Sequence, residues 1–242
     1  MPEEVVENPY RVKVEYGFTF DDKSTAHFDV DVDLQSKEVK HYSKNRHTWT
    51  ELCHHQCEQC PLSTQDHKYC PAIVSIVDII EYFSQKISFT NCKCEVRFPE
   101  KTVVAEKPLQ DVLYSLIGLR LSTSLCPLLS QFKPMARFHE PFSSPFYTVY
   151  RATSLYLLRQ YFKNKKGEKT PWELEGLRSF YSNINAVNSK ISERLKSAEV
   201  MDAAPNSIMI LSLFGTSMTY LFDDFLGVLE KLFECSDPPP QA

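Results

Sequence analysis

Hydrophobic and polar residues alternate most regularly near the start of the chain. Between residues 11 and 20 every second side chain is apolar: Val12, Val14, Tyr16, Phe18 and Phe20. After a polar turn at residues 21–24 the alternation resumes, with Ala26, Phe28, Val30, Val32 and Leu34. A period of two on both sides of a short polar turn is typical of an antiparallel hairpin with one face in water. We therefore predict a hairpin here, followed by a third strand near Val39 and His41.

A second alternating segment lies further along the chain. Its apolar face carries Cys92, Cys94, Val96 and Phe98, and a turn at residues 99–101 separates it from residues 102–105. This pattern predicts a second hairpin. Since Cys92 and Cys94 share the apolar face, we interpret both as small buried hydrophobic residues.

Elsewhere the apolar residues recur every three or four positions, as on one face of a helix. This spacing predicts helices that contain residues 73–83, 109–117, 146–162, 174–195 and 211–232. Pro71 would begin the first helix with Cys70 at its cap, and Thr170-Pro171 would open the fourth. A break at residues 203–207 precedes the last helix. Its seam resembles a coiled coil, and we expect it to pack inside a bundle: Leu211, Phe214, Met218, Leu221, Phe225, Val228 and Leu232.

The order of these elements predicts an α+β fold. Antiparallel β-hairpins with a Cys-rich, metal-binding loop come first, and a C-terminal helical bundle packs on the sheet. No linker separates the two parts, so we predict a single domain over residues 1–242. Within it, residues 8–107 form the β-rich part with the loop at 53–71, residues 108–236 form the helical part, and residues 237–242 are a disordered tail.

Composition excludes several classes of protein. Hydrophobic residues make up 43% of the 242 residues and charged residues 24%, which is typical of a globular protein rather than a disordered one. The net charge of -4 gives no general attraction to nucleic acid or to an anionic membrane. Phosphate-binding glycine motifs and the serine-hydrolase elbow are missing. The acidic N-terminus is no secretory signal, and no apolar stretch is long enough to span a bilayer, so we expect a cytoplasmic protein.

The eight cysteines are the main candidates for chemistry, because cytosolic thiols are mostly reduced or bind metal. Cys57 and Cys60 form a C-x-x-C pair, which brings two sulfurs to one ion, and Cys70 supplies a third ligand. We predict a structural zinc site with His55 as the fourth ligand. Other residues are alternatives for that place: His54, Cys53, His67 and Cys126. An iron–sulfur cluster, completed by Cys53 or Cys126, is the main alternative; a redox pair and a metal-free loop are also considered.

A second candidate segment runs from Cys126 to Phe142. Cys126-Pro127 repeats the arrangement of Cys70-Pro71, so both thiols would lie near helix N-termini that favour the thiolate. Lys133 and Arg137 are candidates to bind an anion, with His139 as acid or base, and Cys126 with His139 is a candidate nucleophile–base pair. In the alternative interpretation Arg137 pairs with a carboxylate such as Glu140, and His139 is a hydrogen-bonded structural residue.

The chain resembles a family of uncharacterised bacterial proteins, a domain of unknown function. The resemblance rests on His55-Gln56-Cys57 with Cys60-Pro61-Leu62, Cys70-Pro71, Lys133-Pro134-Met135-Ala136-Arg137-Phe138-His139, Tyr150-Arg151-Ala152 with Tyr156-Leu157-Leu158, and Leu174-Glu175-Gly176-Leu177. It covers nearly the whole chain. It implies a bacterial cytoplasmic protein and brings no activity with it.

The leading functional hypothesis is a zinc-stabilised protein with a binding or regulatory role. The alternative is an enzyme or anion-binding protein that uses Cys126, Lys133, Arg137 and His139, or an iron–sulfur protein. The expected partner is a protein or a small anionic ligand; a membrane is not expected, and a homodimer stays open. A nucleic-acid role through Arg137, Arg120 and the lysines of residues 163–169 is the third hypothesis.

Overall fold

The computed structural model describes residues 8–38, 40, 42–198, 203–220 and 222–234. Its internal contacts group into two compact units. The first unit comprises Met1–Phe142 with Ala186–Leu211, and the second comprises Ser143–Asn185 with Ser212–Ala242. Each unit is described by itself below. The single domain that the sequence predicts stays a prediction.

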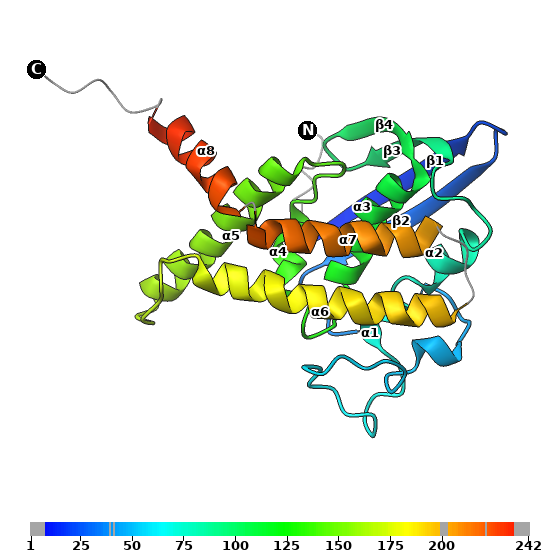
Figure 1. Cartoon of the computed structure of the whole chain (residues 1–242), viewed down its shortest axis with the longest axis horizontal. Helices are drawn as coiled ribbons and strands as arrows, with labels where there is room; N and C mark the ends of the chain where they lie inside the picture. The colour runs from blue at the N-terminus through cyan, green and yellow to red at the C-terminus, as the bar shows by residue number, and fades with distance from the viewer. Residues whose placement is uncertain (1–7, 39, 41, 199–202, 221, 235–242) are drawn as a thin grey trace, which may run out of the picture. The chain divides into compact units, whose positions relative to one another are not determined.

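The first unit contains a four-stranded antiparallel sheet (Figure 1). Its strands are β1 (Arg11–Phe20), β2 (Thr25–Asp33), β3 (Asn91–Arg97) and β4 (Thr102–Pro108), in the order β2-β1-β3-β4. Tyr16 lies opposite Phe28 on one side and Val96 on the other. Every even-numbered residue from Val12 to Phe20 is buried, because these side chains face the core. Both predicted hairpins, and the α+β class, are confirmed.

The two strand cysteines behave as predicted, since Cys92 and Cys94 are both buried among apolar residues. The third strand that we expected near residue 40 is not tested in full, because Val39 and His41 lie outside the described residues. Lys40 and residues 42–47 form no strand.

The segment before β3 forms two short helices, whereas the sequence predicted a single helix from Ile73 to Phe83. These are α1 (Pro71–Val74) and α2 (Val77–Tyr82). Ser75 donates its hydroxyl to the carbonyl of Ala72 at 2.7 Å, and Ile76 leaves the helical region at φ -123°. The prediction was wrong because the apolar residues here are buried on every side, so their spacing did not depend on one continuous helical face.

Four further elements belong to the first unit. They are the 3-10 turn η1 (Thr48–Thr50), helix α3 (Leu109–Ser122), the 3-10 turn η2 (Ser130–Phe132) and helix α4 (Lys133–Arg137). Helix α3 packs on the sheet and buries Leu109, Val112, Leu113, Leu116 and Ile117, which is the predicted apolar stripe.

The second unit is built from α5 (Pro145–Lys165), α8 (Phe222–Glu234) and parts of two helices shared with the first unit, α6 (Glu175–Ser197) and α7 (Ala203–Tyr220). The Ser144 side chain accepts the backbone N–H of Tyr147 at 3.2 Å, and Pro145 occupies the first position of α5. Within this unit Phe146 packs against Phe225, with ring centroids 5.8 Å apart.

Three predictions about the last helices are wrong. Helix α6 begins at Glu175, several residues after Thr170. Helix α7 begins at Ala203, because Pro205 is tolerated in a first turn, whose N–H groups need no helical partner. Val228 and Leu232 are 49% and 57% exposed, so this end of the predicted seam does not pack inside a bundle; Leu221 lies outside the described residues.

Candidate functional site

The Cys-rich loop is closed at its neck by backbone hydrogen bonds. Leu52 N donates to Lys68 O and Cys70 N donates to Thr50 O, each at 2.9 Å, while Glu51 and Tyr69 form an isolated antiparallel bridge. Residues 53–69 between these two ends contain only turns and irregular backbone. The neck therefore holds Cys57, Cys60 and Cys70 on one short closed segment.

A buried arginine of α6 binds this neck. Arg194 is 2% exposed and donates to three backbone carbonyls: Trp49 O at 3.1 Å, Glu51 O at 2.6 Å and Leu52 O at 3.1 Å. A buried cation must be satisfied by hydrogen bonds, so these carbonyls fix the position of the guanidinium. Sequence reasoning missed Arg194. The sequence feature that could have revealed Arg194 is its charge on the apolar stripe of α6, between the buried residues Ile191 and Leu195.

The sulfur atoms of the loop lie close enough for their charges to interact. Cys60 N donates to Cys57 O at 3.0 Å, which bends the C-x-x-C pair into a turn. Burial is the main cause that raises the pKa of Cys57 to about 11, and the nearby Cys70 and Cys60 thiols raise it further. The positive charge of Arg194 acts in the opposite direction and lowers the pKa of Cys57. In the absence of a ligand that displaces the proton, Cys57 is a neutral thiol at neutral pH.

The two cysteine–proline corners turn the backbone differently, since Cys70 begins a helical turn closed by residue 74 and Cys126 begins a tighter turn closed by residue 129. Val74 N donates to Cys70 O, and Leu129 N donates to Cys126 O, each at 3.0 Å. Backbone N–H groups of Ile73 and Ala72 reach the Cys70 thiol and lower its pKa, although burial dominates and the net pKa is raised. At the second corner Leu129 and Leu128 provide the same donors to Cys126. Each corner can therefore donate two N–H groups to one sulfur.

The Cys126 thiol also lies within electrostatic range of the Cys70 and Cys57 thiols of the same unit. Burial is the largest cause that raises the pKa of Cys126 to about 12, and the charges of Cys70 and Cys57 add to it. We call Cys57, Cys60, Cys70 and Cys126 the thiol cluster. Cys70 lies at the N-cap of α1 as predicted, and the N–H groups there lower the pKa of its thiol, but burial raises that pKa more. Helix α1 has only four residues and Cys126 precedes a turn, so burial prevails.

The histidines beside the cluster bind α6. His55 Nδ1 lies 3.0 Å from Glu193 Oε2, and His54 Nε2 lies 2.8 Å from Ser197 Oγ. His55 has a φ of 46°, the left-handed region that a side chain with a Cβ rarely adopts. Among the described residues, no three His, Cys, Asp or Glu side chains already stand where they could hold a metal ion. His55 as the fourth ligand stays a prediction.

A family model matches most of the chain, including the Cys-rich loop. The model of a family described as a domain of unknown function, DUF6901, matches residues 14–234. The chain belongs to this family. No curated protein matches it, and no solved structure does. The DUF6901 match spans both the thiol cluster and Arg194, as well as the sheet from β1 onward. No helix among the described residues is long and apolar enough to cross a membrane.

The second candidate segment of the DUF6901 chain is held at several separate points. Arg137 Nε donates to Pro9 O at 3.0 Å. Burial lowers the pKa of Lys133, and the charge of Asp33 opposes that shift. Glu140 pairs with Lys101, and the interpretation in which Arg137 pairs with a carboxylate such as Glu140 stays a prediction.

His139 belongs to a hydrogen-bonded group on the sheet. Its Nε2 lies 2.7 Å from the hydroxyl of Tyr16, which lies 2.9 Å from Ser115 Oγ. Tyr16 is fully buried on β1, and Ser115 is on α3. Within the described part of the chain no hydrogen bond joins Cys126 to His139. The structure brings Cys126 to the other thiols and His139 to Tyr16, in line with a structural histidine.

No pattern in the sequence indicates that a second arginine, Arg120, is buried. Arg120 is 1% exposed, its Nη2 lies 3.3 Å from Asp78 Oδ2, and its guanidinium lies 3.2 Å above the ring of Tyr42. Arg120 is therefore enclosed in the core of the first unit. The hypothesis that Arg120 contacts nucleic acid was wrong.

Proposed function

We propose that this DUF6901 protein is a zinc-stabilised binding protein in which the thiol cluster holds the metal. The observation that supports this most is that the Cys57, Cys70 and Cys126 thiols of one unit lie within electrostatic range of one another. Thiolate sulfur suits zinc, and four-coordinate sites made of cysteines are usually structural. The site would tie the Cys-rich loop to the segment between α3 and α4.

Cys126 is a better fourth ligand than His55 on the contacts described. The Cys126 thiol is influenced by Cys70 and Cys57, whereas the Nδ1 atom of His55 is 3.0 Å from Glu193. The backbone N–H groups at both corners would donate to the bound sulfurs, as the groups around a metal site commonly do. Four thiolates around Zn²⁺ leave a net negative charge, and the buried cation of Arg194 would offset part of it.

The loop needs such a tie because it has almost no core. Every residue from 58 to 68 is exposed except Cys60 and Leu62, which are partly buried. A segment that buries so little apolar surface cannot offset the entropy of ordering its backbone. Zinc binding supplies folding free energy directly. The sulfurs would move closer as the metal binds, since no three ligands stand in place in the described chain.

An iron–sulfur cluster is the second candidate, because Cys126 provides the fourth thiolate that such a cluster requires. An enzymatic or anion-binding role at Lys133, Arg137 and His139 ranks below both. Each of these residues has its own protein partner or a carboxylate nearby. A cytoplasmic location agrees with free thiols, and the bound partner would be a protein or a small anionic ligand.

Elemental analysis of anaerobically purified protein, with its absorption spectrum, tests the proposal. We expect about one zinc per chain and no visible absorption. Cys126→Ser should lower the zinc content severalfold, while His55→Ala should leave it unchanged. Iron with a broad visible band would replace zinc by a cluster. Protein that folds fully and contains neither metal would refute the proposal.

A further inference from the structure

The end of α5 and the turn after it form an exposed, cationic tip in the second unit. Every residue from 161 to 169 is exposed, and four of them are lysines: Lys163, Lys165, Lys166 and Lys169. None of these lysines pairs with a described carboxylate. Elsewhere cations are neutralised in pairs: Arg11–Asp31, Lys13–Glu15, Lys40–Asp31, Lys93–Glu95 and Lys101–Glu140. The tip thus concentrates charge that the chain itself does not balance.

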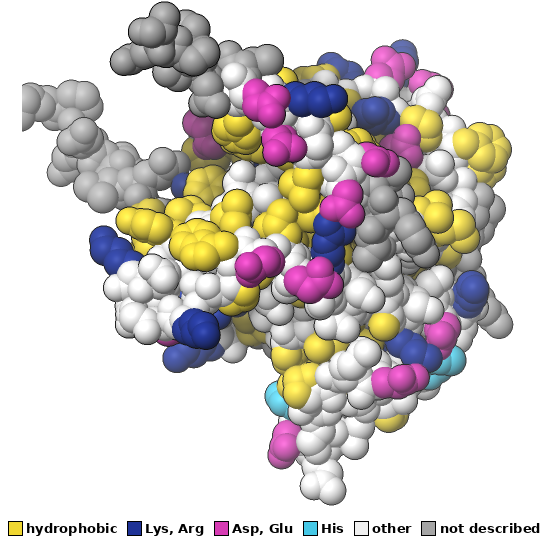
Figure 2. Space-filling view, turned by 60° about the vertical axis from the view of Figure 1, so that its left-hand side comes forward, with side chains coloured by type: hydrophobic (Ala, Val, Ile, Leu, Met, Phe, Trp, Pro, Cys, Tyr) yellow, Lys and Arg dark blue, Asp and Glu magenta, His cyan; other side chains and the backbone are white. Residues whose placement is uncertain are grey.

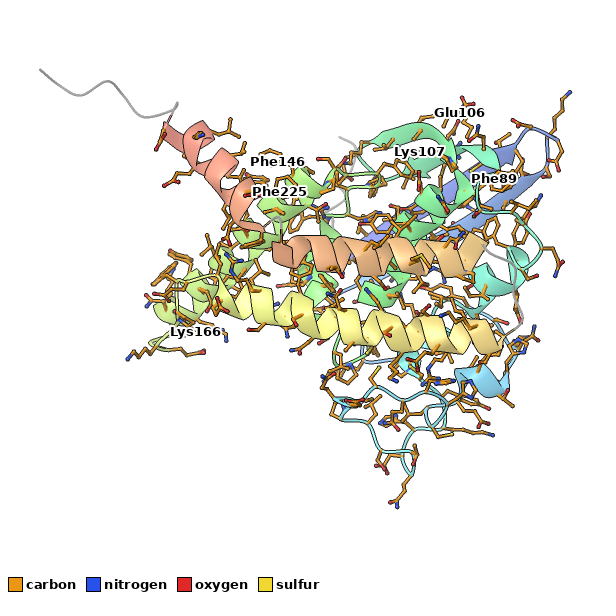
Figure 3. The ribbon with its side chains drawn as sticks, in the orientation of Figure 1. Phe89, Glu106, Lys107, Phe146, Lys166 and Phe225 are labelled. Atoms are coloured by element: carbon orange, nitrogen blue, oxygen red, sulfur yellow. The ribbon has the colours of Figure 1, made fainter. Side chains whose placement is uncertain are left out.

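The backbone fixes how these lysines are presented. Gly167 has a φ of 82°, Gly167 N donates to Asn164 O at 2.8 Å, and Glu168 N donates to Lys163 O at 3.2 Å. These are the two hydrogen bonds of a Schellman motif, which ends a helix with a tight reversal. Figure 3 shows Lys166 at the end of this turn. The lysines therefore surround an ordered, convex turn rather than lining a groove.

Aromatic side chains border the same turn. Tyr161, Phe162 and Trp172 are 50%, 52% and 51% exposed, and Leu158 lies one helical turn before them at 49%. The Tyr161 and Phe162 rings are in contact, with centroids 5.4 Å apart. Exposed apolar side chains that group together often mark a binding surface. Figure 2 shows a face on which hydrophobic side chains gather, with both basic and acidic side chains around them.

We propose that this tip, residues 158–173, docks on an anionic lipid surface. Lysines bind the headgroups of anionic lipids, and Tyr, Trp and Phe favour the boundary between headgroups and acyl chains. Residues 158–173 contain four lysines and Arg159 but only two acidic residues, Glu168 and Glu173. A convex turn can insert into a bilayer surface, whereas single-stranded nucleic acid needs a groove that tracks its backbone.

The expectation that no membrane is involved rested on net charge and on the lack of a spanning segment. Peripheral docking requires neither a basic protein nor a spanning helix, because it depends on the local charge and on shallow aromatic insertion. The inference is also independent of the metal site, which belongs to the other unit.

Co-sedimentation of the full chain with vesicles tests the inference. Vesicles of phosphatidylcholine alone and with added phosphatidylserine should separate neutral from anionic surfaces. Each lysine near such a surface contributes about fivefold in partitioning at moderate salt. Lys163→Ser with Lys165→Ser and Lys166→Ser should therefore lower binding to the anionic vesicles about a hundredfold. Phe162→Ser with Trp172→Ser should weaken binding at high salt, where charge is screened.

The matched control replaces three exposed lysines of the first unit, with Lys23→Ser, Lys37→Ser and Lys44→Ser. It changes the net charge equally and should leave binding within about twofold. Thermal melting of all variants should stay close to that of the parent protein, since the altered side chains are exposed. Absence of binding to anionic vesicles would overturn the inference. So would equal loss in the control, or binding of the tip to single-stranded RNA without binding to vesicles.

Discussion

Two buried arginines each hold separate segments of the first unit in place. Arg194 and Arg120 are 2% and 1% exposed, and each is held by groups distant in the sequence. Arg194 donates only to backbone carbonyls, while Arg120 pairs with Asp78 and stacks on Tyr42. A buried cation is costly without partners, so each arginine fixes the segments that surround it.

Arg194→Met should destabilise the protein strongly. The change removes the donor from three buried or partly buried carbonyls at the neck of the loop. Since hydrogen bonds to charged groups are the stronger ones, we expect the free energy of unfolding to fall by about 3–5 kcal/mol. Urea denaturation measures it.

Arg178→Met on the same helix is the matched control. Arg178 pairs with Asp223, which is 74% exposed. That control should cost about 1–2 kcal/mol, because its partly exposed ion pair and its contact with the Phe222 ring each contribute about 0.5–1 kcal/mol. Equal losses in the two variants would contradict the role given to Arg194.

Asp78 should make stability depend on pH in the unusual direction for an acid. Burial raises its pKa above the ordinary 3.8, and Arg120 only partly opposes this. The folded state therefore holds the proton more tightly, so the stability from Asp78 is complete below pH 3.8 and is lost as pH rises through the folded pKa.

The variant Asp78→Asn isolates that effect, because asparagine does not titrate. We expect the free energy of unfolding of the parent protein, relative to the variant, to be larger at about pH 4 than at about pH 7. Urea unfolding at both pH values gives the difference. A difference that grows with pH would mean that the ion pair with Arg120 outweighs burial.

Among the elements, the strands followed from sequence and the site did not. Strict alternation from Val12 to Phe20 defined β1, because one face of the sheet is buried. The three- and four-residue spacing of apolar residues cannot reveal that α1 ends before Ser75, since apolar residues continue past the break. No pattern of neighbouring residues in the sequence predicts that the Cys126 thiol comes within electrostatic range of Cys70. That approach depends on tertiary packing of segments far apart in the chain.

The Cys-rich loop should become susceptible to protease when its metal is removed. Lys68 is exposed at the neck, and its carbonyl accepts the N–H of Leu52 at 2.9 Å. If zinc supplies the loop's stability, chelation should raise the rate of tryptic cleavage at Lys68 about tenfold or more, because the open state becomes populated. Mass spectrometry of the fragments reads the site of cleavage.

Lys93 on β3 is the internal reference for that experiment, since its backbone is paired on both sides. It should remain resistant while the loop is cut. Equal susceptibility of Lys68 before and after proven zinc removal would show that the metal does not order the loop.

Zinc affinity should rise with pH. Burial raises the pKa of Cys57 to about 11 and that of Cys126 to about 12, so both must release a proton when they bind metal. Competition with a zinc chelator at several values between about pH 6 and pH 8 measures the slope. Affinity that does not change with pH would mean that the ligands are not these thiols.

At the scale of the whole molecule, the two proposals concern different units. The first unit combines the sheet, the thiol cluster and Arg194, whereas the second carries the cationic tip of α5. Membership of DUF6901 covers residues 14–234 and therefore both features. The two proposals can therefore be tested separately, the metal in the first unit and lipid docking in the second.

The central claim is that Cys126 completes the metal site, and cobalt substitution tests it most directly. Co²⁺ replaces Zn²⁺ with the same tetrahedral preference, and its visible bands report the number of thiolate ligands. Parent protein and His55→Ala should give the same intense bands of a four-thiolate site, and Cys126→Ser should shift and weaken them. Bands that change in His55→Ala and persist in Cys126→Ser would contradict the account.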